Sequence, residues 1–101
     1  MLVVRFRIQC LPEKADLVAA TLTDVVTPSR ALPGVVSFDV CRDLTDPNAL
    51  VATEVFEDRQ ALDRQQEQPE VGKALAVLGD ALAAPPEATL FHVSFAEPHG
   101  G

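Results

Sequence analysis

The segment Leu2-Val-Val-Arg-Phe-Arg-Ile-Gln-Cys10 decides the fold of this chain, because its polarity alternates with a period of two. Every even position is apolar, and these positions are Leu2, Val4, Phe6, Ile8 and Cys10. The odd positions from Arg5 to Gln9 are polar. This alternation predicts a β-strand with one face toward a core.

A helical pattern follows the strand. After a break at Leu11-Pro12, apolar residues recur at helical spacing from Glu13 to about Val26. This stripe is typical of an amphipathic helix that packs on a sheet. Because a proline disfavours helical geometry in the residue before it, we expect Pro28 to end the helix near Val26 or Thr27.

The centre of the chain predicts a β-hairpin. Val35 to Arg42 and Ala49 to Phe56 read as strands, and the turn formers of Asp43 to Asn48 join them. On the first strand we place Val36, Phe38 and Val40 on one face. The second strand is apolar on both faces, so its sequence does not say which side faces the core.

Two more helices are expected in the second half. Asp58 is placed to cap a short helix from Arg59 to about Gln66. Pro69 fits the first turn of the next helix, whose apolar stripe continues through Gly79 until Pro85-Pro86. Gly79 inside this helix would cost about 1 kcal/mol relative to Ala.

A last strand at Thr89 to Phe95 completes the order β-α-β-β-α-β. This is the ferredoxin-like α+β arrangement, with an antiparallel sheet and both long helices on one face. We expect the other face to carry Val3, Val35 and Leu90 beside its polar residues. Because that face also needs cover, we predict that two copies pair sheet to sheet as a homodimer.

The composition limits the class of protein. With 101 residues, the chain has the size of one domain, expected at residues 1–97 with a short tail at 98–101. The formal net charge is −7 and no basic cluster is present, which argues against binding to nucleic acid or to an anionic membrane surface. Arg5 and Arg7 interrupt the first apolar run, unlike a signal peptide, and no apolar run is long enough for a membrane helix. We therefore expect a cytoplasmic location.

Motifs for metals, phosphates and nucleophilic catalysis are missing from the sequence. Cys10 and Cys41 do not form a C-x-x-C motif, and we expect both to be buried or half-buried thiols in a reducing compartment. No histidine pair has metal-ligand spacing, and there is no Gly-rich phosphate loop or G-x-S-x-G elbow. We expect no metal and no cofactor.

Several segments together resemble the antibiotic biosynthesis monooxygenase family. They are Thr27–Gly34 as the helix-to-strand connection, Phe38 as a strand aromatic, Asp46-Pro47 as the hairpin turn, Glu54-Val-Phe56 as a Glu-x-aromatic strand motif, and Asp58–Pro69 as the Ala-Leu helix. The resemblance implies a dimeric α+β barrel. It also implies that the chain is a monooxygenase that oxidises a small aromatic or quinol-type compound with dioxygen, without metal or flavin.

The sequence departs from this family in two ways. Gln65 stands where the family often has His, and the chain contains neither Trp nor Tyr. Glutamine cannot act as a general base near neutral pH. Two alternatives therefore stay open: a non-catalytic dimer that binds a small apolar molecule, and an isomerase or turnover enzyme for a small metabolite or signal.

Glu54 and His92 are the candidate catalytic residues. A carboxylate in an apolar strand must be paired, or its pKa must rise. Glu54 is therefore a candidate general base, and the structural alternative is an ion pair with Arg30. His92 is a candidate for removing a phenolic proton, and the alternative is a half-buried histidine at the dimer face.

The candidate substrate-binding residues are Arg30, Phe38, Phe56 and Gln65. Arg30 is suited to orient an anionic or carbonyl group, unless a salt bridge ties it to the sheet. The phenylalanines would line an apolar cavity between sheet and helices. Arg5 and Arg7 share a strand face, where we expect an ion pair with Asp39.

Overall fold

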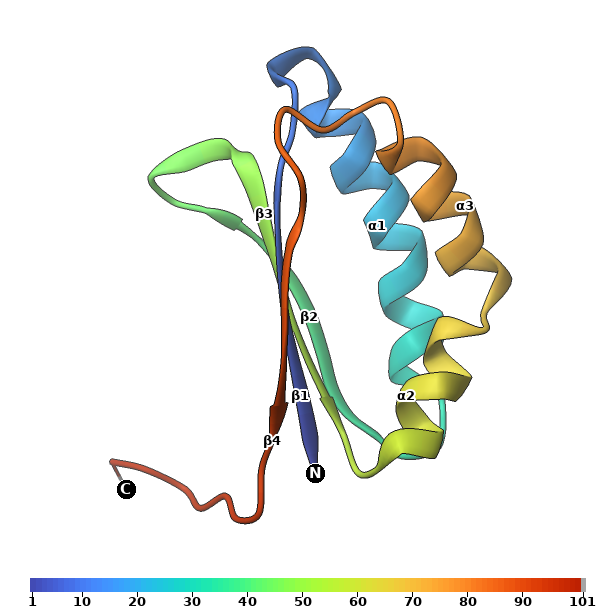
Figure 1. Ribbon diagram of the computed structural model, residues 1–101, viewed down its shortest axis with the longest axis vertical. Coiled ribbons are helices and arrows are strands. Elements are labelled where there is room, and N and C mark those ends of the chain that lie inside the picture. Colours follow the sequence, from blue (N-terminus) through green and yellow to red (C-terminus); the bar gives the residue numbers. More distant parts are fainter. Residues whose placement is uncertain (101) are drawn as a thin grey trace.

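The structure is a computed structural model that describes residues 1–100, with one layer of helices on one face of an antiparallel sheet (Figure 1). The strands are β1 (Leu2–Gln9), β2 (Val35–Asp43), β3 (Asp46–Phe56) and β4 (Glu87–His92), in the spatial order β2-β3-β1-β4. The helices are α1 (Ala15–Arg30), α2 (Arg59–Gln66) and α3 (Pro69–Leu78), and a 3₁₀ turn (Pro12–Lys14) precedes α1. The predicted α+β ferredoxin-like fold is confirmed.

The alternation in β1 sorts the side chains of the sheet onto two faces. Leu2 and Ile8 face the helices and are 7% and 1% exposed. We call the opposite side the bare face, because no helix covers it in Figure 1. By register its residues on the inner strands and β4 include Val3, Arg5, Arg7, Val51, Thr53, Val55, Glu87, Thr89 and Phe91. The register also settles β3, whose Leu50, Ala52, Glu54 and Phe56 face the helices.

Two residues that we expected on the bare face lie on the helix side instead. A β-bulge shifts the register of β2 between Val35 and Ser37, so Val35 pairs with Phe56 and packs against the core. Val36 is the extra residue and is 55% exposed. Leu90 pairs with Val4 and also packs against the core. A bulge inserts one residue and reverses the alternation beyond it, which a period-two pattern cannot anticipate.

Helix α1 continues through Pro28 and ends at Arg30, so the predicted end near Val26 was wrong. Pro28 removes one backbone donor in the last turn only, where tertiary contacts hold the chain. Ser29 is fully buried between α1 and the α2 region, and the Arg30 Nε atom donates a 2.8 Å hydrogen bond to the Phe38 carbonyl. Tertiary packing has overridden the local preference.

Helix α3 ends at Leu78 rather than continuing through Gly79. The residues after Gly79 are needed elsewhere, because they extend the sheet beyond β1. The Leu11 N–H donates to the Ala81 carbonyl, and the Ala83 N–H donates to the Gln9 carbonyl, each at 2.8 Å. Ala81 is therefore buried by backbone pairing, although its position also fitted a helical stripe.

Two strand boundaries also differ from expectation. The hairpin turn is formed by Leu44-Thr45, and Asp46-Pro47 already belongs to β3. Strand β4 begins at Glu87 and ends at His92, instead of reaching Phe95. Beyond His92 one further backbone bond joins the Val93 N–H to the Met1 carbonyl, at 2.9 Å. Past this bond the chain leaves the sheet, since β1 offers no further partner.

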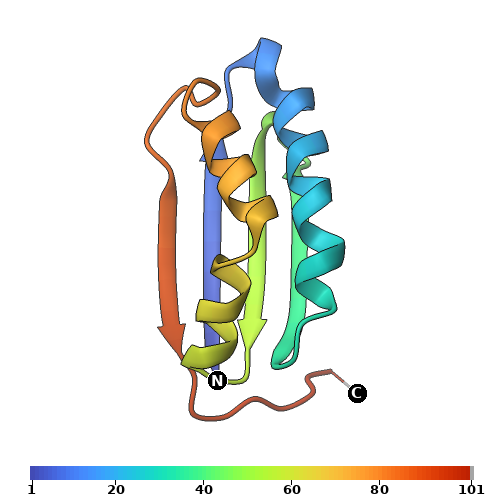
Figure 2. The same ribbon diagram turned by 90° about the vertical axis from the view of Figure 1, so that its right-hand side faces the viewer.

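The helix layer is narrower than the sheet. Figure 2 shows α1 in front of the edge strand β2 and α2 and α3 in front of the inner strands, whereas β4 lies outside the helix layer. Gly34, with φ of 84°, brings the chain from α1 into β2, and a Cβ atom there would lie 2.7 Å from the Ala61 Cβ. Only glycine permits this approach of α2 to the turn. Among residues 1–100 no helix is long and apolar enough to cross a membrane.

Candidate functional site

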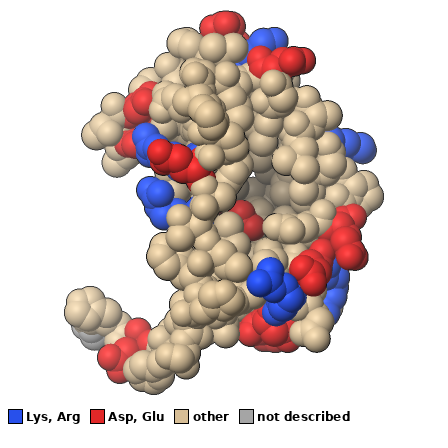
Figure 3. Space-filling model, viewed as in Figure 1, with Lys and Arg blue, Asp and Glu red and all other residues tan. Residues whose placement is uncertain are grey.

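A cavity of about 420 Å³ lies between the sheet and the helices. Its walls are mostly apolar, and they include Val4, Phe6, Ile8, Leu22, Val25, Phe38, Val40, Ala52, Val71, Ala74 and Leu78. The polar side chains among the lining residues are Glu54, Gln65 and Gln66. Figure 3 shows the hollow from the β4 side, with acidic atoms inside it. Volume and lining are those of a small-molecule site.

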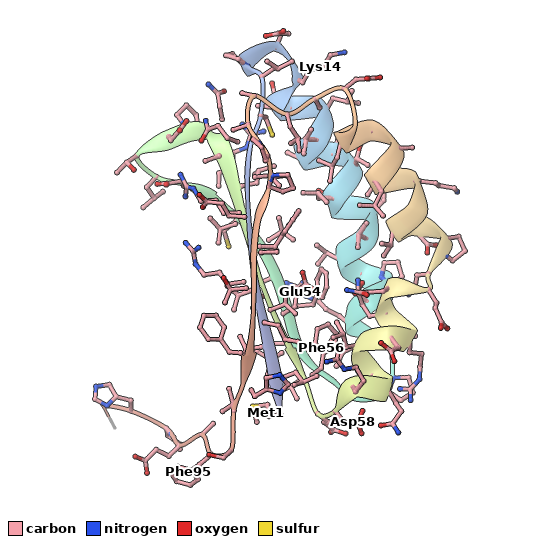
Figure 4. All side chains as sticks on the ribbon, in the orientation of Figure 1. Met1, Lys14, Glu54, Phe56, Asp58 and Phe95 are labelled. Carbon is pink, nitrogen blue, oxygen red and sulfur yellow. The ribbon has the colours of Figure 1, made fainter. Side chains whose placement is uncertain are left out.

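Glu54 is the acidic residue of this cavity. It lies on β3, opposite Val4 of β1 and Phe38 of β2, and Figure 4 shows it on the helix side of the sheet. Desolvation by the surrounding apolar side chains raises the pKa of Glu54 to about 7. The side chain is half-buried and, among residues 1–100, takes part in no ion pair. Near neutral pH both protonation states of this carboxyl are therefore populated.

Gln65 lies across the cavity from the sheet, on α2, and is only 3% exposed. Its Nε2 atom donates a 3.1 Å hydrogen bond to the Ser29 hydroxyl of α1. The Ser29 hydroxyl in turn donates to the Gln68 Oε1 atom at 3.0 Å. We call these three side chains the Ser29 relay; it joins α1 to the junction between α2 and α3.

Arg30 forms no ion pair with Glu54, which contradicts the structural alternative for Glu54, and it forms instead the salt bridge to the sheet that was the alternative for Arg30. Its guanidinium lies 2.9 Å from the Asp39 carboxylate, and its Nε atom donates to the Phe38 carbonyl. Arg30 thus ties the end of α1 to β2 and is absent from the lining of the cavity. Arg7 pairs with Asp43 at 3.0 Å, which corrects the expected pairing of the strand arginines with Asp39.

The structure brings together three of the predicted site residues. Glu54, Phe38 and Gln65 line one cavity. Phe56 is fully buried in the core and does not border the cavity. His92 lies at the end of β4 opposite Leu2, is exposed, and is likewise absent from the lining.

Ser29 and Gln68 belong to the site's polar network, and the sequence analysis did not single them out. A signal for Ser29 was present, because it continues the apolar stripe of α1 four residues after Val25. It was missed because the helix was expected to end before it. Gln68 has no such signal, since its role depends on the contact between α1 and the α2–α3 junction.

Other chemical groups lie outside the cavity. Cys10 is buried as expected, and burial raises the pKa of its thiol. Cys41 is exposed on β2, so the expectation that it is buried or half-buried was wrong. Within residues 1–100 no group of three or more His, Cys, Asp or Glu side chains is placed to hold a metal ion.

Comparison with known proteins agrees with the fold. Residues 1–77 match the family model described as antibiotic biosynthesis monooxygenase. An uncharacterised protein of Synechocystis, sll1783, is 29% identical over 93 residues. That match covers 92% of this chain and 63% of the relative, so the chain spans less than two thirds of the relative's length.

Solved structures extend the comparison. Rv0793 from Mycobacterium tuberculosis superposes with a TM-score of 0.87 and 26% identity, covering 96% of this chain and 98% of that one. A Nitrosomonas europaea protein, provisionally named an antibiotic biosynthesis monooxygenase, has a TM-score of 0.88 and 18% identity, with coverage of 94% and 100%. The matched family model covers most of the chain, and the chain therefore belongs to the antibiotic biosynthesis monooxygenase family.

Proposed function

We propose that this chain is a cofactor-independent monooxygenase that oxidises a small aromatic or quinol-type compound in the cavity between sheet and helices. The observation that carries this proposal is the position of Glu54, an ionisable carboxyl group inside a mostly apolar cavity of about 420 Å³. An apolar pocket of this size favours a small aromatic ligand. A single carboxylate within it is suited to accept one proton.

The reaction needs a proton acceptor before dioxygen reacts. Glu54 would accept the phenolic or enolic proton, and the resulting anion would give electrons to dioxygen. One oxygen atom bonds to the substrate carbon. Cleavage of the O–O bond then forms a carbonyl group on the substrate, while the second oxygen atom leaves as water. The substrate supplies all four electrons, so the equation anthrone + O₂ → anthraquinone + H₂O balances without another reductant.

The raised pKa of Glu54 fits this step. A general base works best when its pKa lies near the working pH, and desolvation brings the pKa of this carboxyl to about 7. The apolar wall around it also leaves the substrate anion poorly solvated by water, which favours electron transfer to dioxygen over protonation.

The proposal includes a homodimer formed through the bare face. Val51 and Val55 are half-buried there in the single chain, and Phe91 is 46% exposed. Sheet-to-sheet pairing would remove this apolar surface from water.

The proposal is tested with anthrone and naphthohydroquinone under oxygen-18 gas. A monooxygenase places one labelled oxygen atom in the quinone product and the other in water. Spontaneous oxidation of naphthohydroquinone instead gives an unlabelled quinone and hydrogen peroxide. We expect labelled product above the protein-free rate. Anaerobic binding of both compounds without labelled product would contradict the monooxygenase and favour a binding protein; failure to bind either would contradict both.

His92 remains a candidate for the proton-handling role that the sequence predicted. Its exposed position beside Leu2 supports a smaller contribution than that of Glu54. We expect His92→Ala to retain at least about a third of the turnover, because general acid–base groups that act directly contribute roughly 100-fold or more. Loss of turnover in this variant would indicate that His92 on β4 accepts the proton.

A further inference from the structure

The direction of the Ser29 relay fixes the orientation of an amide group. A serine hydroxyl carries one proton, and Ser29 donates this proton to the Gln68 Oε1 atom. Ser29 can therefore only accept from Gln65, whose Nε2 atom lies 3.1 Å away. The Gln65 amide nitrogen is held toward Ser29, and its amide oxygen lies on the opposite branch of the side chain.

The position of Gln68 is itself fixed by the backbone. Its N–H donates to the Gln65 carbonyl at 3.3 Å, and its carbonyl accepts from the Val71 N–H at 3.1 Å. These bonds attach Gln68 to both α2 and α3. The Gln68 side chain that accepts from Ser29 therefore extends from a backbone that is held at the junction of the two helices.

The Gln65 Oε1 atom has no hydrogen-bond partner among residues 1–100. In the same part of the chain, no side-chain nitrogen or oxygen that is sealed from solvent lacks a partner. Oε1 must therefore border open space. Because Gln65 is 3% exposed and lines the cavity, that space is the cavity.

We infer that Ser29 is a positioning residue, which holds Gln65 with its amide oxygen toward the cavity so that the site selects a ligand with a second hydroxyl group. This inference rests on the proposed function, in which Glu54 faces the first hydroxyl. An amide oxygen accepts a hydrogen bond from a hydroxyl and offers nothing to a bare ring edge. A dihydroxy aromatic compound is thus favoured over its monohydroxy analogue.

Removing the Ser29 hydroxyl should weaken this preference. In Ser29→Ala neither end of the Gln65 amide can bond to residue 29, so the contact that fixes the orientation of the amide is lost. The amide oxygen would then no longer be held toward the cavity as an acceptor for the ligand's hydroxyl proton. The side chain changes by one atom, so the packing around it is nearly kept.

The experiment is anaerobic calorimetry with naphthohydroquinone and 1-naphthol. We expect the wild-type chain to prefer the dihydroxy compound by roughly tenfold, the ratio provided by one hydrogen bond. In Ser29→Ala this ratio should fall to about twofold or less, and Ser29→Thr, which keeps the hydroxyl, should restore it. The matched control is Ser37→Ala on β2, which should leave the ratio unchanged.

A second measurement needs no ligand. The side-chain amide protons of Gln65 should exchange slowly in NMR spectra of the wild-type chain, because one of them is bonded to buried Ser29. Ser29→Ala should speed this exchange, whereas Ser37→Ala should not. Rapid exchange in the wild-type chain would contradict the Ser29 relay directly.

The outcomes separate this inference from the proposed function. If Ser29→Ala weakens the binding of both ligands equally, Ser29 has only a structural role and the inference is wrong, while the proposed function stands. A wild-type chain that binds the two compounds with equal affinity also contradicts the inference alone. If neither compound binds the wild-type chain, the proposed function fails and the ligand preference fails with it.

Discussion

A carboxyl group near each face of the sheet has a shifted pKa, and the two pKa values are shifted in opposite directions. Glu54 lies on the covered face, where desolvation raises its pKa to about 7. Asp43 lies beside Arg7 of the bare face, and its pKa falls to about 2, mainly through hydrogen bonds from Thr45 and then from Arg7. The two pKa values differ because the Glu54 carboxyl is desolvated without a compensating partner, whereas the Asp43 carboxylate accepts several hydrogen bonds.

The opposite pKa shifts suit the two carboxyl groups to different roles. A carboxyl group with compensating partners is ionised throughout the physiological range and serves structure. A carboxyl group that is desolvated without a partner destabilises the fold, and its retention requires another explanation. The covered face therefore carries the candidate chemistry, while the bare face carries the candidate contact with a second copy. Each of the following predictions tests one side of this division.

The largest effect is expected for Glu54→Gln. This change keeps the shape of the side chain but removes the proton acceptor, so turnover of anthrone should fall by roughly 100-fold to 10,000-fold. Incorporation of oxygen-18 into anthraquinone measures the loss. The control is Glu57→Gln, at the exposed position directly after the same strand, which should keep wild-type turnover. Equal turnover in both variants would remove Glu54 from the mechanism.

The two faces should also differ in what their aromatic residues contribute to stability. Phe38 is 4% exposed in the core, and Phe38→Ala should lower the free energy of unfolding by about 3–5 kcal/mol. Phe91 is 46% exposed on the bare face, and Phe91→Ala should lower the free energy of unfolding of the isolated chain by less than about 1 kcal/mol. Urea denaturation at low protein concentration measures both. Similar losses would mean that the bare face is packed within a single chain.

The pH dependence of stability isolates the covered face. The folded pKa of Glu54, about 7, lies above its ordinary value of 4.5, so folding favours the protonated carboxyl. The contribution of this group is complete below pH 4.5 and is lost as the pH rises through about 7. Between these values the wild-type chain should lose up to about 3 kcal/mol relative to Glu54→Gln.

Urea denaturation of the wild-type chain and of Glu54→Gln, at about pH 5 and about pH 8 and at one protein concentration, measures how their difference in stability changes with pH. A constant difference between them would show that Glu54 keeps an ordinary pKa in the folded chain. Stability that rises with pH in the wild type alone would indicate an unrecognised cationic partner.

The smallest expected effect concerns the bare face. Val55→Asp places a charge in the proposed interface while leaving the covered face unchanged, so the homodimer should dissociate at least about tenfold more readily. Light scattering coupled to size-exclusion chromatography measures the mass of the particle. A wild-type chain that is monomeric at micromolar concentration would refute the homodimer. The control is Val36→Asp, at an exposed position on the edge strand β2.

Part of the site was accessible from the sequence. Glu54 was recognisable because a carboxyl group within an apolar strand is costly, and that reasoning correctly required either a partner or a raised pKa. Phe38 was placed correctly because the alternation in β2 holds beyond the bulge. His92 and Phe56 were selected from their residue types and strand positions, which do not specify whether a side chain borders a cavity.

The sequence by itself determined the order of the elements and the covered face of β1, because these depend on local periodicity. Only the tertiary structure decided that α1 passes through Pro28, that α3 stops at Leu78, and that Ser29 meets Gln65 and Gln68. These features depend on contacts between segments about 36 to 39 residues apart, or on backbone pairing that overrides a local preference. A local pattern holds no information about such contacts until the chain has closed around its core.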